Sequence, residues 1–281
     1  MQRNADYNLY KARMIFGILF KLSTKTTTYC LTMRKQLILA FILFSIQLEA
    51  QSWKLIWSDE FNYTGLPDTT KWIHEVGNIK NSELQHYTNH RAENSIVKNG
   101  NLHIIARRED FQQAKYTSAR LSTDTKFNFK YGKIEARIKT STGKGLWPAF
   151  WLLGQNINEV GSPECGEIDI MEHVNTEDKI NSAMHWDNNG LMSLTKTTNC
   201  DVRQFHTYTV EWDKSSIKWF LDGKRYFEGK IKATNQNTDE FQQPFYIILN
   251  MAVGGKWPGE PDNTTLFPDT LCVDYVRVYQ K

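Results

Sequence analysis

Apolar and polar residues alternate in short runs along most of the chain from Trp53 onward. This period of two is typical of β-strands that bury one face. Turn-forming pairs interrupt two of the runs, Asn99-Gly100 within 96–106 and Asp222-Gly223 within 217–227, and predict two β-hairpins. Further strands are expected over residues 131–140, 146–154, 166–174, 180–186, 205–213, 245–253 and 272–280.

Segments with helical periodicity are scarce, and the best candidate, residues 68–76, is short. Many short strands at regular spacing, without an internal repeat, favour a single all-β sandwich. We therefore expect one catalytic or binding domain over residues 51–281, with no linker dividing it.

Residues 1–50 have a different character. Basic Arg34 and Lys35 precede an apolar run, residues 37–46, that is too short to span a bilayer, and Ala50 follows it. A buried strand rarely follows a basic pair so closely, and a membrane anchor should be longer. We predict an N-terminal leader with a signal peptide that starts at Met33 and ends near Ala50, and hence a secreted or periplasmic protein.

The net charge changes once the leader is set aside. Of the 34 basic and 31 acidic residues, seven and two lie in residues 1–50, so residues 51–281 carry 27 and 29, a net charge of −2. A near-neutral domain has no electrostatic basis for binding nucleic acid or, after removal of the leader, a membrane.

The cysteines give a modest signal. Cys30 lies in the leader, and the three that remain exclude a fully paired disulfide framework and form no CxxC metal motif. A Cys165–Cys200 bridge and two separate thiols both stay open. Cys272 lies in an apolar strand pattern and is expected to be a buried thiol.

The stretch GEIDIMEH combines three carboxylates with apolar residues. Strand parity puts Glu167 and Asp169 on one face and Glu172 on the other. Ile170 belongs to the opposite, buried face, and apolar Met171 follows it out of phase. A β-bulge near Met171 would shift the phase and return Glu172 to the face of the other two acids.

Two glutamates beside an aspartate suit a glycosidase, in which one carboxylate attacks the anomeric carbon and the other protonates the departing oxygen. A retaining enzyme holds the two carboxyl groups about 5–5.5 Å apart. On a flat strand the two glutamates would be separated by roughly 13 Å. The sheet is therefore expected to be concave as well as bulged.

Tryptophans supply platforms on which sugar rings could stack. Trp147 and Trp151 are four residues apart and share a face if that segment is extended, and Trp257 lies in the Gly-rich loop GGKWPG. Aromatic rings stack well on the apolar faces of sugars, and core packing is the alternative. We expect all three to line a substrate cleft.

The sequence of residues 53–281 resembles glycoside hydrolase family 16, the laminarinase-type β-glucanases. The motifs that carry the resemblance are WSDEF, NSELQHYT, TSARL, YGKIEARIK, GLWPAFWLLG, GEIDIMEH, FHTYTVEW, the NMAVGG loop and VDYVRVYQ.

The resemblance implies a concanavalin-like β-sandwich, or jelly roll, with a concave substrate cleft and a retaining double-displacement mechanism. It implies that Glu167 is the nucleophile, Glu172 the general acid/base, and Asp169 the residue that tunes the nucleophile. In the family, an inserted methionine accompanies laminarinases, whereas the regular EIDIEF form marks lichenase-type enzymes. Positions that line sugar subsites in relatives correspond here to Asn81, Glu83, Arg120, Trp147, Trp151 and His185.

Some family members also bind a structural calcium, at positions that correspond to Glu60, Gly100 and Asp274. Carboxylates and a backbone carbonyl suit calcium.

No cofactor is expected for catalysis. The protein is expected to be a monomer that hydrolyses β-1,3-glucan at bonds within the polysaccharide. Alternatives are the same chemistry on mixed-linkage β-1,3-1,4-glucan or an algal galactan; a non-catalytic carbohydrate-binding sandwich would have no use for the acid pair.

Overall fold

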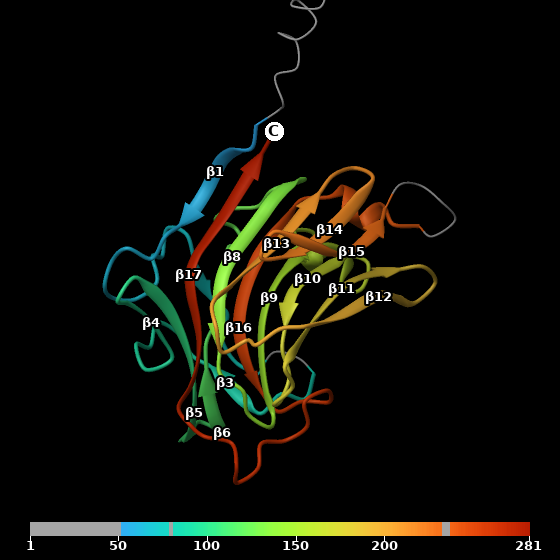
Figure 1. The fold of residues 1–281 in the computed structure, drawn as a ribbon. Coiled ribbons are helices and arrows are strands. Elements are labelled where there is room, and N and C mark those ends of the chain that lie inside the picture. The colour runs from blue at the N-terminus through green and yellow to red at the C-terminus, as the bar shows by residue number, and fades with distance from the viewer. Residues whose placement is uncertain (1–51, 79–80, 232–236) are drawn as a thin grey trace, which may run out of the picture. The chain divides into compact units, whose positions relative to one another are not determined.

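Two β-sheets packed face to face form the unit from Trp53 to Lys281 (Figure 1). The computed structural model describes residues 52–78, 81–231 and 237–281. Within these residues the predicted all-β sandwich is confirmed. The expected leader, residues 1–50, and its proposed start and cleavage points lie outside the described residues.

The larger sheet has the strand order β15-β14-β13-β8-β17-β5-β6-β3, with β1 beside β17 and β4 beside β5. Its strands are β1 (Lys54–Asp59), β3 (Gln85–Tyr87), β4 (Ser95–Lys98), β5 (Asn101–Phe111), β6 (Ala114–Ser118), β8 (Gly132–Thr140), β13 (His206–Trp212), β14 (Ser216–Leu221), β15 (Lys224–Lys230) and β17 (Asp269–Gln280).

The smaller sheet has the order β12-β11-β10-β9-β16-β7-β2. Its strands are β2 (Ile73–His74), β7 (Arg120–Ser122), β9 (Leu146–Gly154), β10 (Glu167–Glu172), β11 (Lys179–Asp187), β12 (Leu191–Asn199) and β16 (Phe245–Val253). Helical structure in the described residues is limited to α2 (Ile157–Val160) and a 3-10 turn, η1 (Asp239–Gln242).

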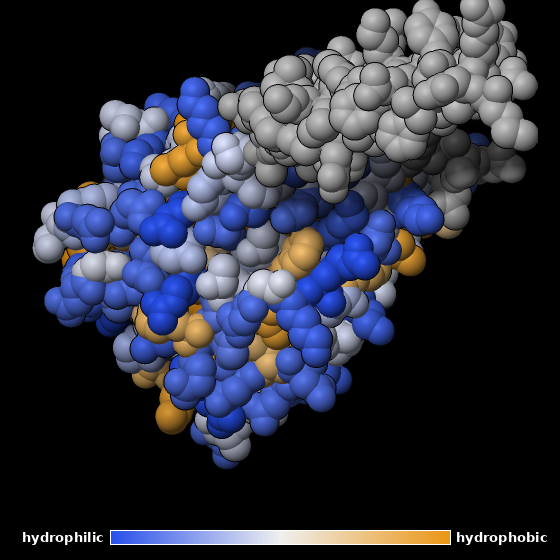
Figure 2. Space-filling model, turned by 45° about the horizontal axis from the view of Figure 1, so that its top comes forward, coloured by the Kyte–Doolittle hydropathy of each residue, from blue (hydrophilic) through white to orange (hydrophobic). Residues whose placement is uncertain are grey.

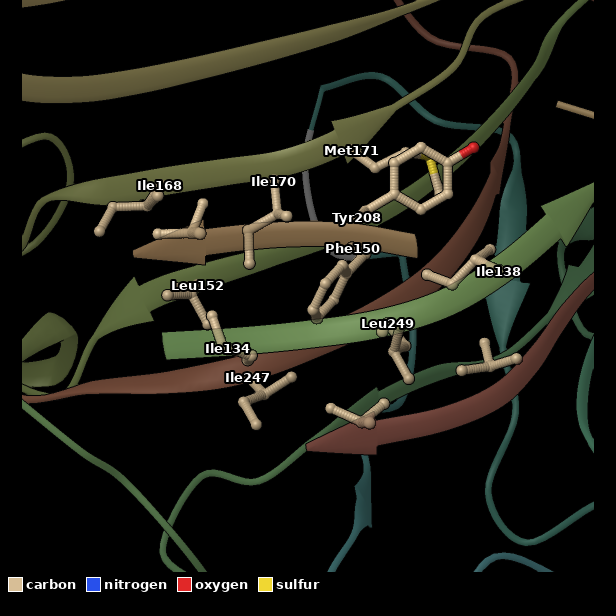
Figure 3. Close-up of a cluster of buried hydrophobic side chains, with 14 of the residues drawn as sticks. Ile134, Ile138, Phe150, Leu152, Ile168, Ile170, Met171, Tyr208, Ile247 and Leu249 are labelled. Atoms are coloured by element: carbon tan, nitrogen blue, oxygen red, sulfur yellow. The ribbon is translucent and has the colours of Figure 1, made fainter. Parts of the chain in front are cut away.

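The hydrophobic core lies between the sheets and draws on the inward-facing residues of both (Figure 3). Ile134 of β8 comes from the larger sheet, and Phe150 of β9, Ile168 of β10 and Leu249 of β16 come from the smaller one; all four are essentially inaccessible to solvent. The alternating residues on the other face of the smaller sheet are therefore available to form a site.

Both predicted hairpins are present, as β4–β5 and β14–β15. Each turn needs two residues with positive φ, which is the geometry that matches the twist of a two-residue hairpin. Asn99 and Gly100 have φ of 53° and 72°, and Asp222 and Gly223 have 49° and 75°.

The helix expected over residues 68–76 is wrong. The segment forms a turn, in which the amide of Trp72 donates to the carbonyl of Asp68, and then the short strand β2, which pairs with β7. Trp72 is buried in the core. Pairing with the sheet edge and burial of Trp72 outweigh the weak helix propensity of a segment rich in β-branched residues.

The structure decides between the two alternatives left open for Cys165 and Cys200 and corrects the expectation of a buried thiol at Cys272. The structure contains no Cys165–Cys200 bridge. Cys165 packs in a small cluster with Leu153, whereas Cys200 joins the main core and its Sγ lies 3.4 Å from the Tyr208 hydroxyl. Cys272 is only partly buried, because its side chain lies on the outer face of β17.

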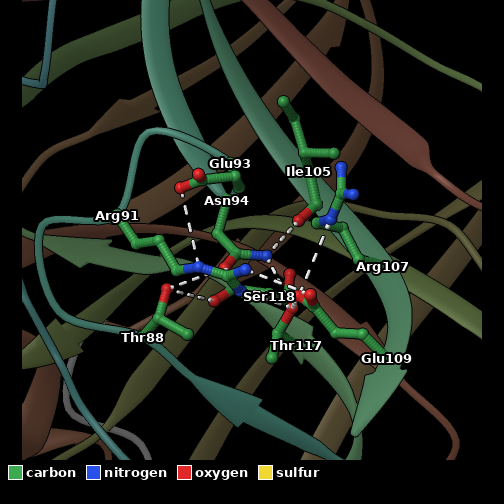
Figure 4. A network of polar contacts seen from close by, with 9 residues as sticks. All are labelled: Thr88, Arg91, Glu93, Asn94, Ile105, Arg107, Glu109, Thr117 and Ser118. Atoms are coloured by element: carbon green, nitrogen blue, oxygen red, sulfur yellow. Dashed lines mark hydrogen bonds and ion pairs between the residues drawn. The ribbon is translucent and has the colours of Figure 1, made fainter. Parts of the chain in front are cut away.

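Away from the core, ion pairs tie the loop after β3 to β5 and β6 (Figure 4). Arg91 forms a two-pronged ion pair with Glu109, with a closest N–O distance of 2.5 Å, and the Asn94 amide donates to Thr117. On the face shown in Figure 2, hydrophilic residues predominate and hydrophobic ones occur in small groups. No helix among the described residues is long and apolar enough to cross a membrane.

Candidate active site

A cleft of about 510 Å³ crosses the outer face of the smaller sheet. Most of its lining comes from β7, β16, β9, β10, β11 and β12, which is also the order in which these strands pair, while Asn81, Glu83, Ser162 and Trp257 lie outside the strands. All ten residues expected at the catalytic and substrate positions line this cleft: Asn81, Glu83, Arg120, Trp147, Trp151, Glu167, Asp169, Glu172, His185 and Trp257.

The predicted β-bulge lies in β10 and is confirmed. Asp169 pairs with Trp151 of β9, but Met171 pairs with the next residue along, Phe150, so the register shifts by one between them. Met171 joins the buried core beside Ile170 (Figure 3), and Glu172 returns to the cleft. Two consecutive residues thus face the core, and all three carboxylates face the same cleft.

Two side chains from outside β10 hold the bulged strand. The Ser182 hydroxyl of β11 donates to the carbonyl of Ile170 at 2.8 Å, and the indole N–H of Trp219 in β14 donates to the carbonyl of Asp169 at 2.8 Å. A bulge disrupts the regular ladder, and buried carbonyls left without partners would cost stability. The opposite sheet therefore helps to fix the position of the carboxylates.

Burial and mutual repulsion strongly perturb the acids. Burial, with the nearby charge of Glu167, raises the pKa of Asp169 well above its usual value. Burial, Asp169 and Glu167 also raise the pKa of Glu172 well above its usual value, although the Trp147 indole opposes this by donating to Glu172 Oε1 at 2.9 Å. Glu172 therefore keeps its proton to higher pH than an ordinary glutamic acid.

On one side of the carboxylates, an aromatic platform is held by polar contacts. The indole of Trp151 donates to Asn250 Oδ1 at 2.8 Å, and the Arg120 guanidinium lies over its ring, 4.7 Å from the ring centroid. Arg120 Nε donates in turn to Glu75 Oε2 at 2.6 Å. These contacts fix the orientation of the Trp151 ring in the cleft.

Two further tryptophans, Trp147 and Trp257, form a pair at the wall of the cleft beside Glu172. Trp147 and Trp257 meet edge to face with ring centroids 5.2 Å apart, and Trp257 stays 46% exposed. Glu83 is held by the amide of Gln85 at 2.7 Å and the hydroxyl of Tyr87 at 3.1 Å. The cleft thus combines paired carboxylates with flat apolar rings and fixed polar groups, the lining expected of a sugar-binding site.

Comparison with known proteins decides the family. The model of the glycosyl hydrolases family 16 matches residues 83–277. The chain belongs to this family. A β-glucanase from Rhodothermus marinus is 41% identical over 248 residues, which cover 83% of this chain and 87% of the relative. The laminarinase structure from Rhodothermus marinus matches with a TM-score of 0.76 at 40% identity and covers 82% of this chain and 98% of that one.

A second relative of this family 16 chain is part of a larger protein. The clotting factor G alpha subunit of Tachypleus tridentatus is 42% identical over 235 residues, which cover 81% of this chain. The match spans 34% of the length of that subunit. The shared family and the carboxylates in the cleft make the protein a glycoside hydrolase.

Sequence reasoning missed several residues of the family 16 cleft. Asn250 and Glu75 orient Trp151 directly or through Arg120, while Asn181 and Leu191 line the side formed by β11 and β12. Asn250 follows an unbroken apolar run in β16. A lone polar residue in such a strand needs a hydrogen-bond partner, and this was the sequence signal that could have identified Asn250 as part of the site.

The calcium position fits poorly. β17 pairs with β1 as far as Asp59–Val276 and with β5 as far as Leu102–Val273, so Glu60 and Gly100 follow strand ends that meet β17 near Asp274. Both carboxylates already have arginine partners. Arg277 donates to both oxygens of Glu60, at 3.0 and 2.7 Å, and Arg137 Nη1 lies 2.7 Å from Asp274 Oδ2. A guanidinium inside the ligand set would repel a cation, so these residues do not form a calcium site in this arrangement.

Chelation should therefore have little effect on stability. Calcium that bound only the folded state would stabilise it by mass action and raise the melting temperature. Since these residues do not form a calcium site, we expect the melting temperatures in EDTA and in calcium chloride to agree within about 1 °C. Differential scanning calorimetry at matched ionic strength checks this. A rise of several degrees in calcium, absent from a Glu60→Gln variant, would contradict it.

Glu75 should act on substrate binding through Arg120. We expect Glu75→Gln to raise KM about 5–30-fold, corresponding to one or two kcal/mol, with little change in kcat. The reason is that Arg120, once unpaired, no longer holds the Trp151 ring. Glu109→Gln is a matched control, since it breaks the ion pair with Arg91 outside the cleft (Figure 4) and should change stability without changing KM. Equal KM effects in both variants would exclude a specific role.

The Asp169 carboxyl group should lower the free energy of unfolding at neutral pH. At low pH both folded and unfolded states hold its proton; as pH rises, the unfolded state releases the proton first, and folding stability falls until the raised folded-state pKa is passed. Asp169→Asn should thus raise the melting temperature increasingly above about pH 4, by a few degrees at about 2–4 °C per kcal/mol. Asp201→Asn, whose exposed carboxylate has a lowered pKa owing to Arg203, should show no such gain. A pH-independent difference for Asp169→Asn would contradict the prediction.

Proposed function

We propose that the protein is an endo-acting hydrolase of β-1,3-linked glucan that works by retaining double displacement. The observation that carries this proposal is the bulge at Met171, which brings Glu172 into the cleft that holds Glu167 and Asp169. The names of the Rhodothermus marinus relatives, a β-glucanase and a laminarinase, support the choice of substrate.

In the proposed first step, the Glu167 carboxylate attacks the anomeric carbon as the bond to the leaving sugar breaks. Glu172 gives its proton to the departing oxygen. Its raised pKa supports this role, because a general acid must still hold its proton near the working pH. Trp147, which donates to Glu172 Oε1, orients the carboxyl group.

In the second step, water attacks the glycosyl-enzyme ester and Glu172 accepts its proton, which releases a product of unchanged anomeric configuration. Formation of the ester removes the charge of Glu167, and this makes ionisation of Glu172 easier. Asp169, which is buried between the two glutamates on the same strand face, adjusts both equilibria. The pH–rate profile will therefore report the coupled group.

The position of the carboxylates supports attack within a polymer. They lie on β10, and the cleft continues over β9, β16 and β7 on one side and over β11 and β12 on the other. A chain lying along the cleft would extend in both directions past the cleaved bond. This is the arrangement expected for endo action.

Charge in the cleft argues against a sulfated galactan as the substrate. Among the described residues that line it, Arg120 is the one lysine or arginine, and Glu75 already neutralises it. A sulfated polymer would need unpaired cations to bind its anionic groups. A mixed-linkage β-1,3-1,4-glucan is neutral and remains the main competing substrate.

We also propose that the protein is secreted or periplasmic and acts as a monomer. The basic pair and apolar run of the leader support export. One chain supplies all residues of the cleft, which supports action without a partner subunit. Mass spectrometry of the protein recovered outside the cytoplasm would test cleavage near Ala50, and light scattering after size exclusion would test the monomer.

One experiment tests the substrate proposal. The purified protein is incubated with laminarin, lichenan and agar, and the products are identified by chromatography while NMR records the first-formed anomer. We expect fastest release of oligosaccharides from laminarin, initially as β-anomers. Faster cleavage of lichenan would favour mixed-linkage glucan, and initial α-anomers would rule out retention.

A further inference from the structure

Three side chains of the cleft form a compact group with the ligand types of a transition-metal site. Glu167 and His185 are directly opposite each other in the β10–β11 pair, and Asp169 follows on the same face. Each offers one oxygen or nitrogen atom, and all three atoms lie within 4.8 Å of one another. His185 Nε2 lies 3.1 Å from Asp169 Oδ2.

Asp169 supplies an independent indication that a cation fits. Its side chain is 4% exposed, and its Oδ2 has His185 Nε2 3.1 Å away but no partner among the described residues with the geometry of a hydrogen bond. A buried carboxylate oxygen without a hydrogen bond is costly unless a proton or a cation satisfies it. The oxygen faces the cleft, within reach of His185 and Glu167.

The surrounding charge also favours a cation. Within the described residues, neither Asp169 nor Glu172 has a lysine or arginine at ion-pair distance, and the basic side chain beside Asp169 is that of His185. A divalent ion would relieve the mutual repulsion of the carboxylates.

We propose that Glu167, Asp169 and His185 bind one divalent transition-metal ion of the Zn²⁺ class, and that the bound ion blocks the cleft. Two carboxylates and one imidazole leave a fourth position for water, as in three-ligand zinc sites. The imidazole disfavours the hard cations Ca²⁺ and Mg²⁺, which prefer oxygen ligands.

Inhibition follows from the position of the ligands, and this consequence rests on the proposed function. The ion would occupy the carboxylate that attacks the sugar and would stand where the reacting ring must lie. It should therefore compete with substrate and raise KM without changing kcat.

Binding is tested first, without any assay of activity. The chelator-treated protein is titrated with Zn²⁺ by isothermal calorimetry, and Co²⁺ is added in a parallel sample to record the visible absorption of a bound ion. We expect one ion per chain, and His185→Gln should weaken binding at least about tenfold, because loss of even an outer partner of a metal ligand costs 10–100-fold.

His206→Gln is the matched control. His206 Nδ1 lies 2.6 Å from Asp222 Oδ2 in an exposed histidine–aspartate pair on the other sheet, away from the cleft. This variant should bind Zn²⁺ as the wild type does. Binding that survives His185→Gln, or that is lost in His206→Gln, would overturn the proposed site.

Inhibition is tested second. We expect Zn²⁺ to inhibit competitively in the wild type and in His206→Gln, with a potency that follows the calorimetric affinity. Stoichiometric binding with non-competitive or no inhibition would overturn the blocking role while leaving the metal site in place. If no glucan is cleaved at all, the calorimetric result still decides whether the ion binds, so failure of the proposed function can be told apart from failure of the site.

Discussion

Replacing Glu167 with alanine is expected to lower kcat on β-1,3-glucan by at least about four orders of magnitude, since loss of a catalytic nucleophile has effects of this size in other enzymes. Glu172→Ala should lower it by about 10²–10⁴, the contribution typical of a general acid or base. Neither change should unfold the protein, because both side chains are partly exposed in the cleft. Initial rates and thermal unfolding of the same preparations check both statements.

Azide distinguishes the two roles. With an activated glycoside as substrate, azide should restore turnover of Glu167→Ala by entering the space of the missing carboxylate and should give an α-glycosyl azide. In Glu172→Ala the glycosyl-enzyme still forms, and azide attacks it from the opposite face to give a β-glycosyl azide. NMR of the products reads out the anomer.

Two outcomes would contradict the assignment. Near-normal turnover by Glu167→Ala would exclude it as the nucleophile, and exchanged azide products would exchange the two roles. As a matched control, Glu164→Ala removes a glutamate close in sequence that does not line the cleft, and it should retain full activity.

Deletion of Met171 is expected to lower activity on laminarin at least about 100-fold, the size of effect that a misplacement of about 1 Å can have on a catalytic group. Without this residue, ordinary strand parity would still direct the final glutamate into the cleft. It would still lie opposite Ala149 and Asn181, but the bulge that bends β10 and re-aims its side chain would be lost. Because the regular spacing marks lichenase-type enzymes, the ratio of lichenan to laminarin activity should rise.

Two substitutions separate spacing from packing. Met171→Leu keeps the residue count and about the same volume, so activity should stay near that of the wild type. Met171→Ala keeps the bulge but empties part of the core, since Met171 is fully buried, and should destabilise the protein by about 2–5 kcal/mol while preserving kcat. Loss of activity in Met171→Leu, or its retention in the deletion variant, would show that the bulge does not set the geometry.

Much of the site could be predicted because its signals are local. The parity conflict among Ile170, Met171 and Glu172 is visible in adjacent residues, and a bulge was the simplest way to resolve it. Likewise, Asn99-Gly100 carries its turn geometry in its own dihedral preferences. The motifs of the family added the roles of the carboxylates, which parity alone leaves unassigned.

Other features depended on segments that the sequence keeps far apart. The short strand at Ile73 exists because β7 lies beside it, and this pairing overrides the local helical pattern of residues 68–76. The spacing of Cys165 and Cys200 in the sequence does not show whether they form a disulfide. In the folded protein the two side chains pack into separate clusters, and both are free thiols. The poor fit of the calcium position has a similar origin, because no ligand motif in the sequence indicates that Arg277 pairs with Glu60.

The sequence by itself determined the all-β class, both hairpins, the carboxylates of the cleft and the need for a bulge, because alternation and turn preference are encoded in neighbouring residues. Tertiary structure decided how those groups are held and charged. Arg120 meets Glu75 across 45 residues, and Asn250 meets Tyr87 across 163. The raised pKa of Glu172 and the unsatisfied oxygen of Asp169 likewise arise from burial and proximity, which exist only once the two sheets have closed on each other.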